Sequence, residues 1–333
     1  MAAPGSALAS SSRRALRRFL DTAPAPWGAL TAPLQRQGAG VADVLTPAGA
    51  RAASNQIVRA RMKSVNNIKK ITMAMKMVAA SKLRTMQVKA ENSRGMWQPF
   101  TALLGDAPSI KAEKKLIVVL SSDKGLCGGI NSTSVKYTRT LFKLHKLEGE
   151  GKEVKMVLIG DKGKGQLQRE YNKTFSQFFT ETQKEGINFT QCAMISDEIV
   201  KNNKYDVLHM VFNKFESAVS FLPTVATIFS TDMFTTEEGL KVCKMDDYEM
   251  EGDDSQSDVM MNLAEFQMAA VLYNGMLENA TSEMGARMSA MDNSTRNAGD
   301  VLARLTLSYN RSRQSAITTE LIEIISGAAA LEG

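Results

Sequence analysis

The 333-residue sequence has few of the residues that build metal sites and disulfide networks, with three cysteines and two histidines. Cys127, Cys192 and Cys243 lie far apart, and no two of them stand in CxxC spacing. This pattern excludes a zinc knuckle or a disulfide framework and indicates a reducing compartment. His145 and His209 are isolated in the sequence, so we interpret them as packing residues and expect neither a metal site nor a cofactor.

Long hydrophobic runs are also absent. No stretch of about 18 consecutive apolar residues occurs, so we expect no direct membrane span. Aromatic residues make up only 6% of the chain, whereas methionine occurs 20 times. Because methionine favours helices and fills irregular contacts, this composition indicates a helix-rich protein with adaptable contact surfaces. A hydrophobic content of 44% still suffices for a globular core.

Lysine is missing from residues 1–52, which hold five of the eight prolines and six arginines. The stretch SSSRRALRRFL would form a short amphipathic helix, with Leu16, Phe19 and Leu20 opposite the arginines. An arginine-rich, acid-poor amphipathic segment is typical of a mitochondrial transit peptide, which we predict for residues 1–52. The alternative is a disordered tail without a targeting role.

Residues 53–108 are expected to contain a long N-terminal helix. No proline precedes Pro99 in this segment, and we expect Pro99 to end the helix. Residues seven apart form two rows, which is typical of a coiled-coil seam. The first row is Val58, Val65, Thr72, Ala79 and Met86, and the second is Arg61, Ile68, Met75 and Lys82. Ile71 and Val78 form a further apolar row outside this seam.

Residues 258–333 are expected to form a second, longer helix. A helix of this length needs packing partners, so we predict that it pairs antiparallel with the helix in 53–108 and that its tip projects beyond. An apolar row at the tip favours a surrounding protein socket, whereas a bundle with partners inside the chain is the alternative. The first seam row is Leu263, Ala270, Leu277, Met284, Met291, Ala298 and Leu305. The second row is Phe266, Tyr273, Ala280, Arg287, Ser294, Val301 and Ser308, and the tip row is Ile317, Leu321, Ile324 and Ala328.

Charge is unevenly distributed along the chain. The first helix carries ten cationic residues between positions 59 and 94 against one acid, Glu91. Such a face suggests nucleic-acid binding, but no aromatic residues are interleaved with the cations and no nucleic-acid motif is present. A basic helix inside an acidic protein sleeve explains the charge as well, and we expect no nucleic-acid partner. The acidic stretch 245–258 is interpreted as a solvated loop.

Residues 109–257 alternate buried strands with amphipathic helices, which predicts a central Rossmann-like domain with a mainly parallel sheet. The strands are expected in KKLIVVL, KEVKMVLIG and YDVLHMVFNKF, with an edge strand in SAVSFLPTVATIFS at Pro223. The fold class expected for the whole chain is therefore α/β: a long antiparallel coiled coil of N- and C-terminal helices plus this central domain.

Glycines follow the first two expected strands, in DKGLCGG and GDKGKG. Glycines between a strand and a helix suggest phosphate binding, but neither stretch matches the P-loop or the G-x-G-x-x-G pattern. A tight turn capped by Asn131 or Ser132 is the favoured alternative. No nucleophile–base pair supports catalysis, so we expect the chain to have no catalytic site of its own.

Four segments resemble the gamma subunit of F-type ATP synthases: MKSVNNIKKITMAMKMVAASKL (62–83), SSDKGLCGGIN (121–131), ARMSAMDNSTRNA (286–298) and ITTELIEIISGAAAL (317–331). The resemblance covers residues 54–333 in the order of the family. It implies a central rotor whose coiled coil lies inside a ring of alternating alpha and beta catalytic subunits. It also implies a base that binds delta and epsilon subunits, rides on the membrane c-ring and is turned by proton flow.

The resemblance also implies partner-contact residues in the two helices. The family's polar catches match Met75, Lys76, Arg287, Gln314, Thr318 and Glu320, and Ile324 belongs to the apolar bearing at the tip. Partner carboxylates, amides or backbone groups are expected to satisfy Arg287 and Glu320. The alternative for Arg287 is a seam residue whose head reaches solvent. The dithiol segment of plastid members is missing, which favours a mitochondrial member. The resemblance then implies a peripheral position on the matrix side of the mitochondrion inner membrane.

Overall fold

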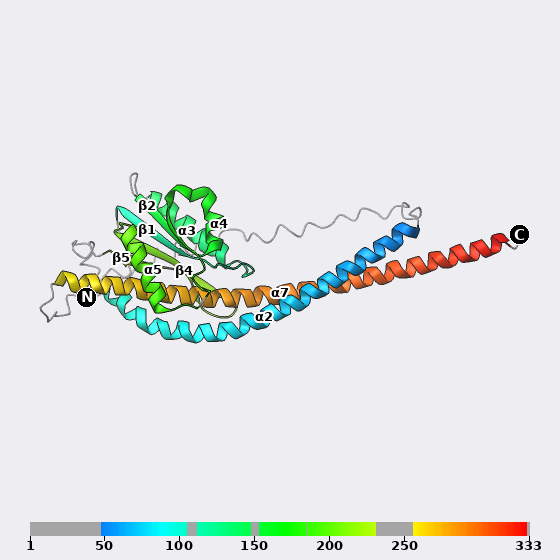
Figure 1. Cartoon of the computed structure of the whole chain (residues 1–333), viewed down its shortest axis with the longest axis horizontal. Helices are drawn as coiled ribbons and strands as arrows, with labels where there is room; N and C mark the ends of the chain where they lie inside the picture. Colours follow the sequence, from blue (N-terminus) through cyan, green and yellow to red (C-terminus); the bar gives the residue numbers. More distant parts are fainter. Residues whose placement is uncertain (1–47, 105–111, 148–152, 185, 231–255, 332–333) are drawn as a thin grey trace, which may run out of the picture. The chain divides into compact units, whose positions relative to one another are not determined.

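The computed structural model describes residues 48–104, 112–147, 153–184, 186–230 and 256–331. Residues from Ser54 onward form one compact unit, in which the two long terminal helices run together along one side of a central α/β domain (Figure 1). The elements are α2 (Ala48–Leu104), β1 (Lys114–Leu120), α3 (Ile130–Leu147), β2 (Glu153–Ile159), α4 (Asp161–Tyr171), η3 (Asn172–Thr174), β3 (Phe175–Phe179), α5 (Phe189–Asn202), β4 (Val207–Phe215), β5 (Phe221–Phe229) and α7 (Gln256–Leu331).

The sheet has the strand order β3-β2-β1-β4-β5. β1 pairs in parallel with β2 and β4, and β2 pairs in parallel with β3, so the first four strands form the Rossmann-like arrangement that the sequence predicts. β5 joins β4 antiparallel, and Pro223 pairs with Asn213. The predicted edge position of Pro223 is therefore confirmed, since a proline that cannot donate a ladder hydrogen bond is tolerated on an outer strand.

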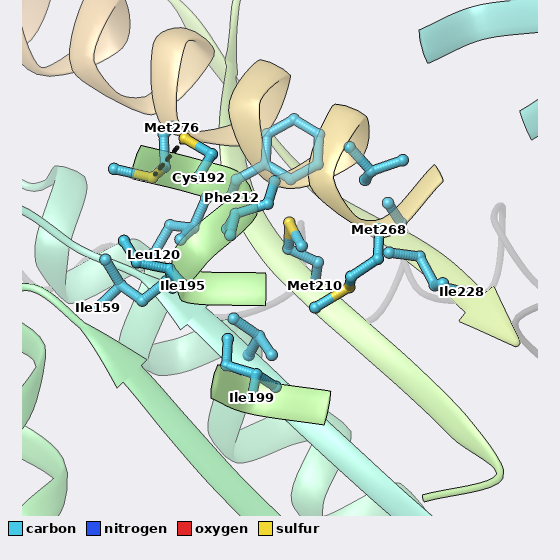
Figure 2. Close-up of a cluster of buried hydrophobic side chains, with 14 of the residues drawn as sticks. Leu120, Ile159, Cys192, Ile195, Ile199, Met210, Phe212, Ile228, Met268 and Met276 are labelled. Atoms are coloured by element: carbon cyan, nitrogen blue, oxygen red, sulfur yellow. Dashed lines mark hydrogen bonds between the residues drawn. The ribbon is translucent and has the colours of Figure 1, made fainter. Parts of the chain in front are cut away.

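Alternate residues of β1 enter two different cores, as the twofold periodicity of a strand requires. Leu116 and Leu120 face the core formed with α5 and α7, in which Ile195 and Met268 lie (Figure 2). Ile117 and Val119 face a second core with α3 and α4. Both faces of the central strand are thus buried, which explains its unbroken apolar sequence.

The helices α2 and α7 pair antiparallel, as predicted. Thr72 hydrogen-bonds Thr295, and Ser93 hydrogen-bonds Asn274. Between these two contacts the chain advances 21 residues along α2 and returns 21 residues along α7. Three heptads on one helix therefore match three on the other, which is the register of an antiparallel coiled coil.

The first seam row of each helix is confirmed, whereas the second rows hold only in part, at Met75, Tyr273, Ala280, Arg287 and Ser294, which are buried or half-buried. Arg61, Ile68, Lys82, Val301 and Ser308 are exposed. The partner rows lie four residues after the first rows rather than three. They hold Met62, Lys69, Lys76, Leu83 and Ala90 on α2, and Thr295, Leu302, Tyr309 and Ala316 on α7, all half-buried or buried. Lys69 and Lys76 lie at the seam with their ammonium groups next to α7, beside Gly299 and Asp292, so a search for apolar side chains missed them.

The expectation that Pro99 ends the first helix is also wrong, because α2 continues to Leu104. Proline removes one backbone donor and disfavours helix around it, but tertiary contacts hold the last turns here. The ring of Phe100 packs edge-on against Phe266 of α7 with centroids 5.1 Å apart, and Trp97 packs against the main core. These aromatic contacts outweigh the local preference.

The second helix runs from Gln256 to Leu331, two residues earlier than predicted at its start. At about 1.5 Å per residue, its 76 residues extend on the order of 110 Å. Every residue from Glu320 to Leu331 is exposed, which confirms the projecting tip. Two predictions lie largely outside the described residues: the transit peptide predicted for 1–52, as far as residue 47, and the acidic loop predicted for 245–258, as far as residue 255. In the described part of the chain, none of the helices combines the length and apolarity that crossing a membrane requires.

Candidate functional site

Four of the residues expected to contact partners lie on the far part of α7. Gln314, Thr318, Glu320 and Ile324 are all exposed, and Ile324 keeps 68% of its surface accessible. The Thr318 hydroxyl donates to the Gln314 carbonyl at 3.0 Å. The surrounding tip displays large apolar side chains, namely Ile317, Leu321, Ile322, Ile325 and Leu331. A contiguous apolar surface on an exposed helix indicates a protein contact.

Met75 and Lys76 lie on α2, and both are half-buried. The Lys76 ammonium contacts the Asp292 carboxylate at 2.6 Å, and Arg296 contacts the other oxygen of the same carboxylate at 2.5 Å. The hydrogen bond from Lys76 is the main cause that lowers the pKa of Asp292. Lys76 therefore has a partner inside the chain, at the point where the two helices meet.

An apolar row on α2 faces away from the seam. Ile68, Ile71 and Val78 expose more than half of their surface, and Met73, Met77 and Val88 do so as well. The sequence predicted such a row at Ile71 and Val78, and the structure confirms that it points outward. Because these side chains have no seam role, they form a second candidate surface for partner contact.

Arg287 is 9% exposed, so the alternative of a head that reaches solvent is wrong. Its guanidinium pairs with the Glu283 carboxylate one turn earlier at 2.5 Å and donates to the Gly125 carbonyl at 3.4 Å. Burial raises the pKa of Glu283, and the positive charge of Arg287 opposes this rise. The carboxylate that the sequence expected from a partner protein is thus supplied within the chain, and Arg287 fastens the 121–130 turn to α7.

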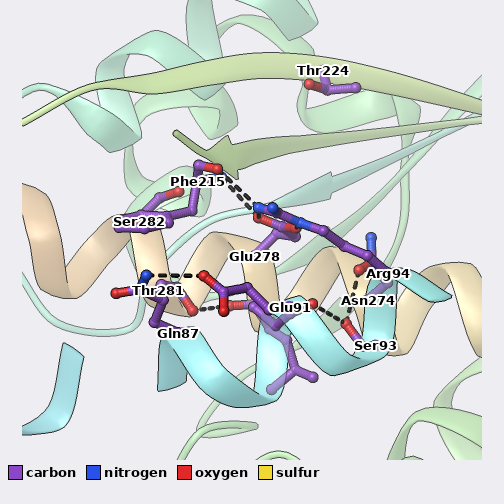
Figure 3. Close-up of polar contacts among 12 residues, drawn as sticks. Gln87, Glu91, Ser93, Arg94, Phe215, Thr224, Asn274, Glu278, Thr281 and Ser282 are labelled. Carbon is purple, nitrogen blue, oxygen red and sulfur yellow. Dashed lines mark hydrogen bonds and ion pairs between the residues drawn. The ribbon is translucent and has the colours of Figure 1, made fainter. Parts of the chain in front are cut away.

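An ion pair that the sequence did not reveal, between the half-buried Arg94 and the buried Glu278, joins α2 to α7 beside the sheet (Figure 3). Arg94 donates through Nε and Nη2 to the two oxygens of Glu278, at 2.5 and 3.1 Å. The Glu278 carboxylate also accepts from the Phe215 amide at 2.8 Å, and Arg94 donates to the Phe215 carbonyl at 2.9 Å. The hydrogen bond to Glu278 is the main cause that raises the pKa of Arg94, so the guanidinium stays charged.

The glycine turns are used for packing within the domain. The first three amides of α4 donate to the end of β1: Asp161 to Asp123, Lys162 to the Ser122 carbonyl, and Gly163 to the Ser121 hydroxyl. These are the donors that a bound phosphate would need at a helix N-terminus. Asn131 does not act as the expected cap; its side chain holds the Ser122 amide and hydroxyl instead.

The predicted contact residues do not gather in one pocket. Lys76 meets Asp292, and Glu320 lies 28 residues further along α7, about 42 Å away at helical rise. Arg287 lies beside the α/β domain instead. The candidate site is therefore an extended surface along two helices, and no constellation for bond-making chemistry emerges from the predicted residues.

Some residues that sequence reasoning missed left a signal, and others did not. Glu283 stands four residues before Arg287, a spacing at which helical side chains pair, so this partner was readable. Arg94 and Glu278 are 184 residues apart. They could have been paired from the sequence only if the antiparallel register had been known to the exact residue.

Comparisons with known proteins agree with this architecture. The family model described as ATP synthase matches residues 54–331. The protein named ATP synthase subunit gamma, mitochondrial, from Ipomoea batatas is 56% identical over 314 residues, which cover 94% of each chain. Its namesake from Arabidopsis thaliana is 54% identical over 326 residues, covering 96% of this chain and 97% of the relative.

A solved structure shares the fold at much lower identity. It is a chain of the Euglena gracilis mitochondrial ATP synthase, in an assembly of OSCP, F1 and c-ring, with a TM-score of 0.70 and 18% identity. The similarity covers 84% of this chain and 95% of that one. From the family match and the two relatives above 50% identity, we conclude that the chain belongs to the gamma-subunit family of ATP synthases.

Proposed function

We propose that this chain is the shaft that couples proton flow through a membrane sector to ATP synthesis in an alpha–beta catalytic head by rotation. Family membership makes it the central-stalk rotor of a mitochondrial ATP synthase. The observation that carries the mechanical part is the antiparallel α2–α7 pair with its projecting, exposed tip. A stiff rod that protrudes from its own domain has an apolar end with no role in its own fold.

The apolar tip suits a bearing. Hydrophobic contact is non-directional, so a rod held by it turns without breaking a fixed set of hydrogen bonds at each step. Ile324 and its exposed neighbours are the proposed bearing surface, inside the upper part of the head. Gln314, Thr318 and Glu320 carry polar groups on the exposed helix and are the proposed catches that contact the alpha and beta subunits.

The roles proposed for Lys76 and Arg287 differ from the direct partner contacts that the resemblance implies. Both are paired within the chain, to Asp292 and Glu283. Lys76 keeps 42% of its side chain exposed, so a partner carboxylate can share it with Asp292, and the neighbouring Met75 lies beside it. Arg287 is enclosed by its own chain, and its proposed contact with the head therefore runs through the 121–130 turn that it holds.

The asymmetry of the rod gives it a task in catalysis. A threefold ring cannot by itself hold its three sites in different conformations. An off-centre rod meets each subunit with a different face, and this difference in contact free energy favours a different state at each site. The chain itself contributes no catalytic residue in this proposal. Nucleotide chemistry takes place in the alpha and beta partners.

The remaining parts of the proposal concern place and partners. The α/β domain is the base that binds delta and epsilon subunits and rides on the c-ring. The chain sits peripherally on the matrix side of the mitochondrion inner membrane. Residues 1–52 act as the transit peptide, supported by their arginine-rich, acid-poor composition.

The test is co-purification. An affinity-tagged chain is isolated from detergent-treated organelle membranes. It is expected to bring down the alpha and beta subunits together with ATPase activity that an inhibitor of the oligomycin type blocks. The control is the same chain without residues 317–333, which is expected to recover less of the head. Isolation of the full-length chain free of ATPase subunits would contradict the proposal.

A further inference from the structure

The feature that carries a new inference is the joint formed by Arg94, Glu278 and Phe215. Glu278 is 1% exposed, and its two oxygens accept from Arg94 and from the Phe215 amide. Arg94 returns a hydrogen bond to the Phe215 carbonyl. These bonds close a ring that ties α2, α7 and the end of β4 to one another (Figure 3).

The other polar α2–α7 contacts, including the buried hydrogen bond from Ser93 to Asn274, join the two helices alone. Ala79 and Ala90 are small, buried seam residues, and apolar packing of this kind resists sliding only weakly because it has no preferred direction. Thr72 contacts Thr295, and Lys76 contacts Asp292 at the half-exposed face. Of these contacts, the one at Arg94 also reaches the sheet.

Beside this joint, α7 is also hydrogen-bonded to the sheet near the end of β4. Ser282 donates to the Asn213 carbonyl at 2.9 Å, and the Asn213 amide donates to Asn279 at 2.9 Å and to the Ser134 hydroxyl at 2.8 Å. The end of β4 is therefore held by α7 and α3 together. A force on the α/β domain is therefore transmitted directly to α7 at this point, and the hydrogen bonds of Arg94 transmit part of it to α2.

We propose that the Arg94–Glu278–Phe215 ring is the mechanical joint that carries torque between the α/β domain and the two-helix shaft. The inference rests on the proposed rotary function and deepens it by naming the residues that bear the load. All three are positioning residues, since none touches nucleotide. The pair is bidentate and charge-assisted, Glu278 is buried and the Arg94 side chain keeps 27% of its surface exposed. Such a pair is strongly directional, so it opposes shear between the two helices.

Stability alone is a weak reason for this pair. Taking two charges out of water costs free energy that their attraction roughly offsets, and apolar residues of similar volume stabilise a fold about as well. A joint under load differs, because it must keep its geometry while the shaft is twisted. Stability and load-bearing therefore make different predictions for a variant with an apolar pair in place of the charges.

The experiment uses the complete synthase, with the chain assembled with its partners in proteoliposomes. The variants are Arg94→Met combined with Glu278→Leu, Arg94→Lys alone, and Leu83→Ala as control. Leu83 is a buried seam residue outside the ring, so Leu83→Ala lowers the melting temperature and leaves the joint intact. Each complex is assayed for its melting temperature, ATP hydrolysis without load, and ATP-driven proton pumping against an imposed gradient.

The joint predicts that Arg94→Met/Glu278→Leu and Arg94→Lys hydrolyse ATP without load within about twofold of the parent. Pumping against the gradient is expected to fall about fivefold in the same complexes. Leu83→Ala is expected to pump normally at an equal or lower melting temperature. The proposed joint is ruled out if the pumping loss instead follows the melting temperature across all variants. It is also ruled out if the complex with the apolar pair pumps protons like the parent.

Two further readouts keep the result decisive. If the apolar pair does not assemble, Arg94→Lys decides by the same assay, because it keeps the charge and loses the two-pronged geometry. If the unaltered chain supports no proton pumping in the assembled complex, the proposed rotary function fails, whatever the variants do.

Discussion

Thr72 on α2 and Thr295 on α7 share a hydrogen bond of 2.8 Å, and three heptads further along Ser93 and Asn274 share one of 2.9 Å. The two contacts fix both the direction and the register of the helix pair. Everything that the shaft does mechanically depends on this register, because it places Lys76 beside Asp292 and Arg94 beside Glu278.

The register predicts a specific crosslink. In the double variant Thr72→Cys/Thr295→Cys, the two sulfur atoms replace hydroxyl groups 2.8 Å apart, so mild oxidation is expected to form a disulfide in most molecules. The control is Ile71→Cys/Thr295→Cys, in which residue 71 faces outward and is 58% exposed. Gel mobility with and without reductant measures both. Equal crosslinking of the two variants would rule out the register.

Replacement by alanine is expected to have opposite effects on stability at Gly160, in the turn before α4, and at Gly165, inside α4. A Cβ at Gly160, which has φ +105°, would lie 2.3 Å from the Ser121 carbonyl oxygen, whereas a Cβ at Gly165 would meet nothing within 4 Å. Gly160→Ala is therefore expected to lower the free energy of unfolding by about 3 kcal/mol. Gly165→Ala is expected to raise it by up to about 1 kcal/mol through helix propensity.

Urea unfolding of the two glycine variants and the parent measures these differences. A Gly160→Ala protein as stable as the parent would show that this turn does not pack as described.

His209 predicts a pH dependence of stability. Burial, reinforced by the nearby His145 and Lys115, lowers the pKa of His209 to about 3 from an ordinary value of 6.5. Thr227 faces the same ring from β5. The unfolded chain thus binds a proton below pH 6.5 that the folded chain refuses, so stability is full above this pH and falls as pH drops toward 3.

Between pH 7 and pH 5, the parent is expected to lose about 2 kcal/mol more than the variant His209→Gln, which lacks this titration. Urea unfolding at several pH values gives the difference directly. Parallel pH curves for the two proteins would contradict the buried, neutral state of His209.

The exposed tip predicts that shortening α7 leaves the fold intact. Without Ile317–Gly333, the free energy of unfolding of the α/β domain is expected to change by less than about 0.5 kcal/mol, because the residues from Glu320 to Leu331 are all exposed. Assembly with the head or torque is expected to weaken. Differential scanning calorimetry checks the first expectation. Loss of the domain's own cooperative transition would count against a modular tip.

The sequence predicted those parts of the fold that follow from periodicity. Unbroken apolar strands and the seven-residue rows gave the α/β domain and the first seam rows. The second rows held only in part because Lys69 and Lys76 lie at the seam and Ile68 is exposed. Strand β3, with the sequence FSQFF, was missed because it is short and only partly buried.

The functional residues were less accessible to sequence reasoning. The exposed tip was predictable, since apolar residues at the end of a helix longer than its partner can have no seam role. The contact of Arg287 with Gly125 was not, because it depends on how the 121–130 turn packs against α7. The Arg94–Glu278 pair required the three-dimensional register itself.

Rotation under the microscope tests the central claim most directly. With the alpha–beta head fixed to a surface and a bead attached through Leu147→Cys, a position 83% exposed on the α/β domain, ATP is expected to drive continuous rotation in one direction. A head that hydrolyses ATP at its full rate while the bead only fluctuates about one angle would contradict the account.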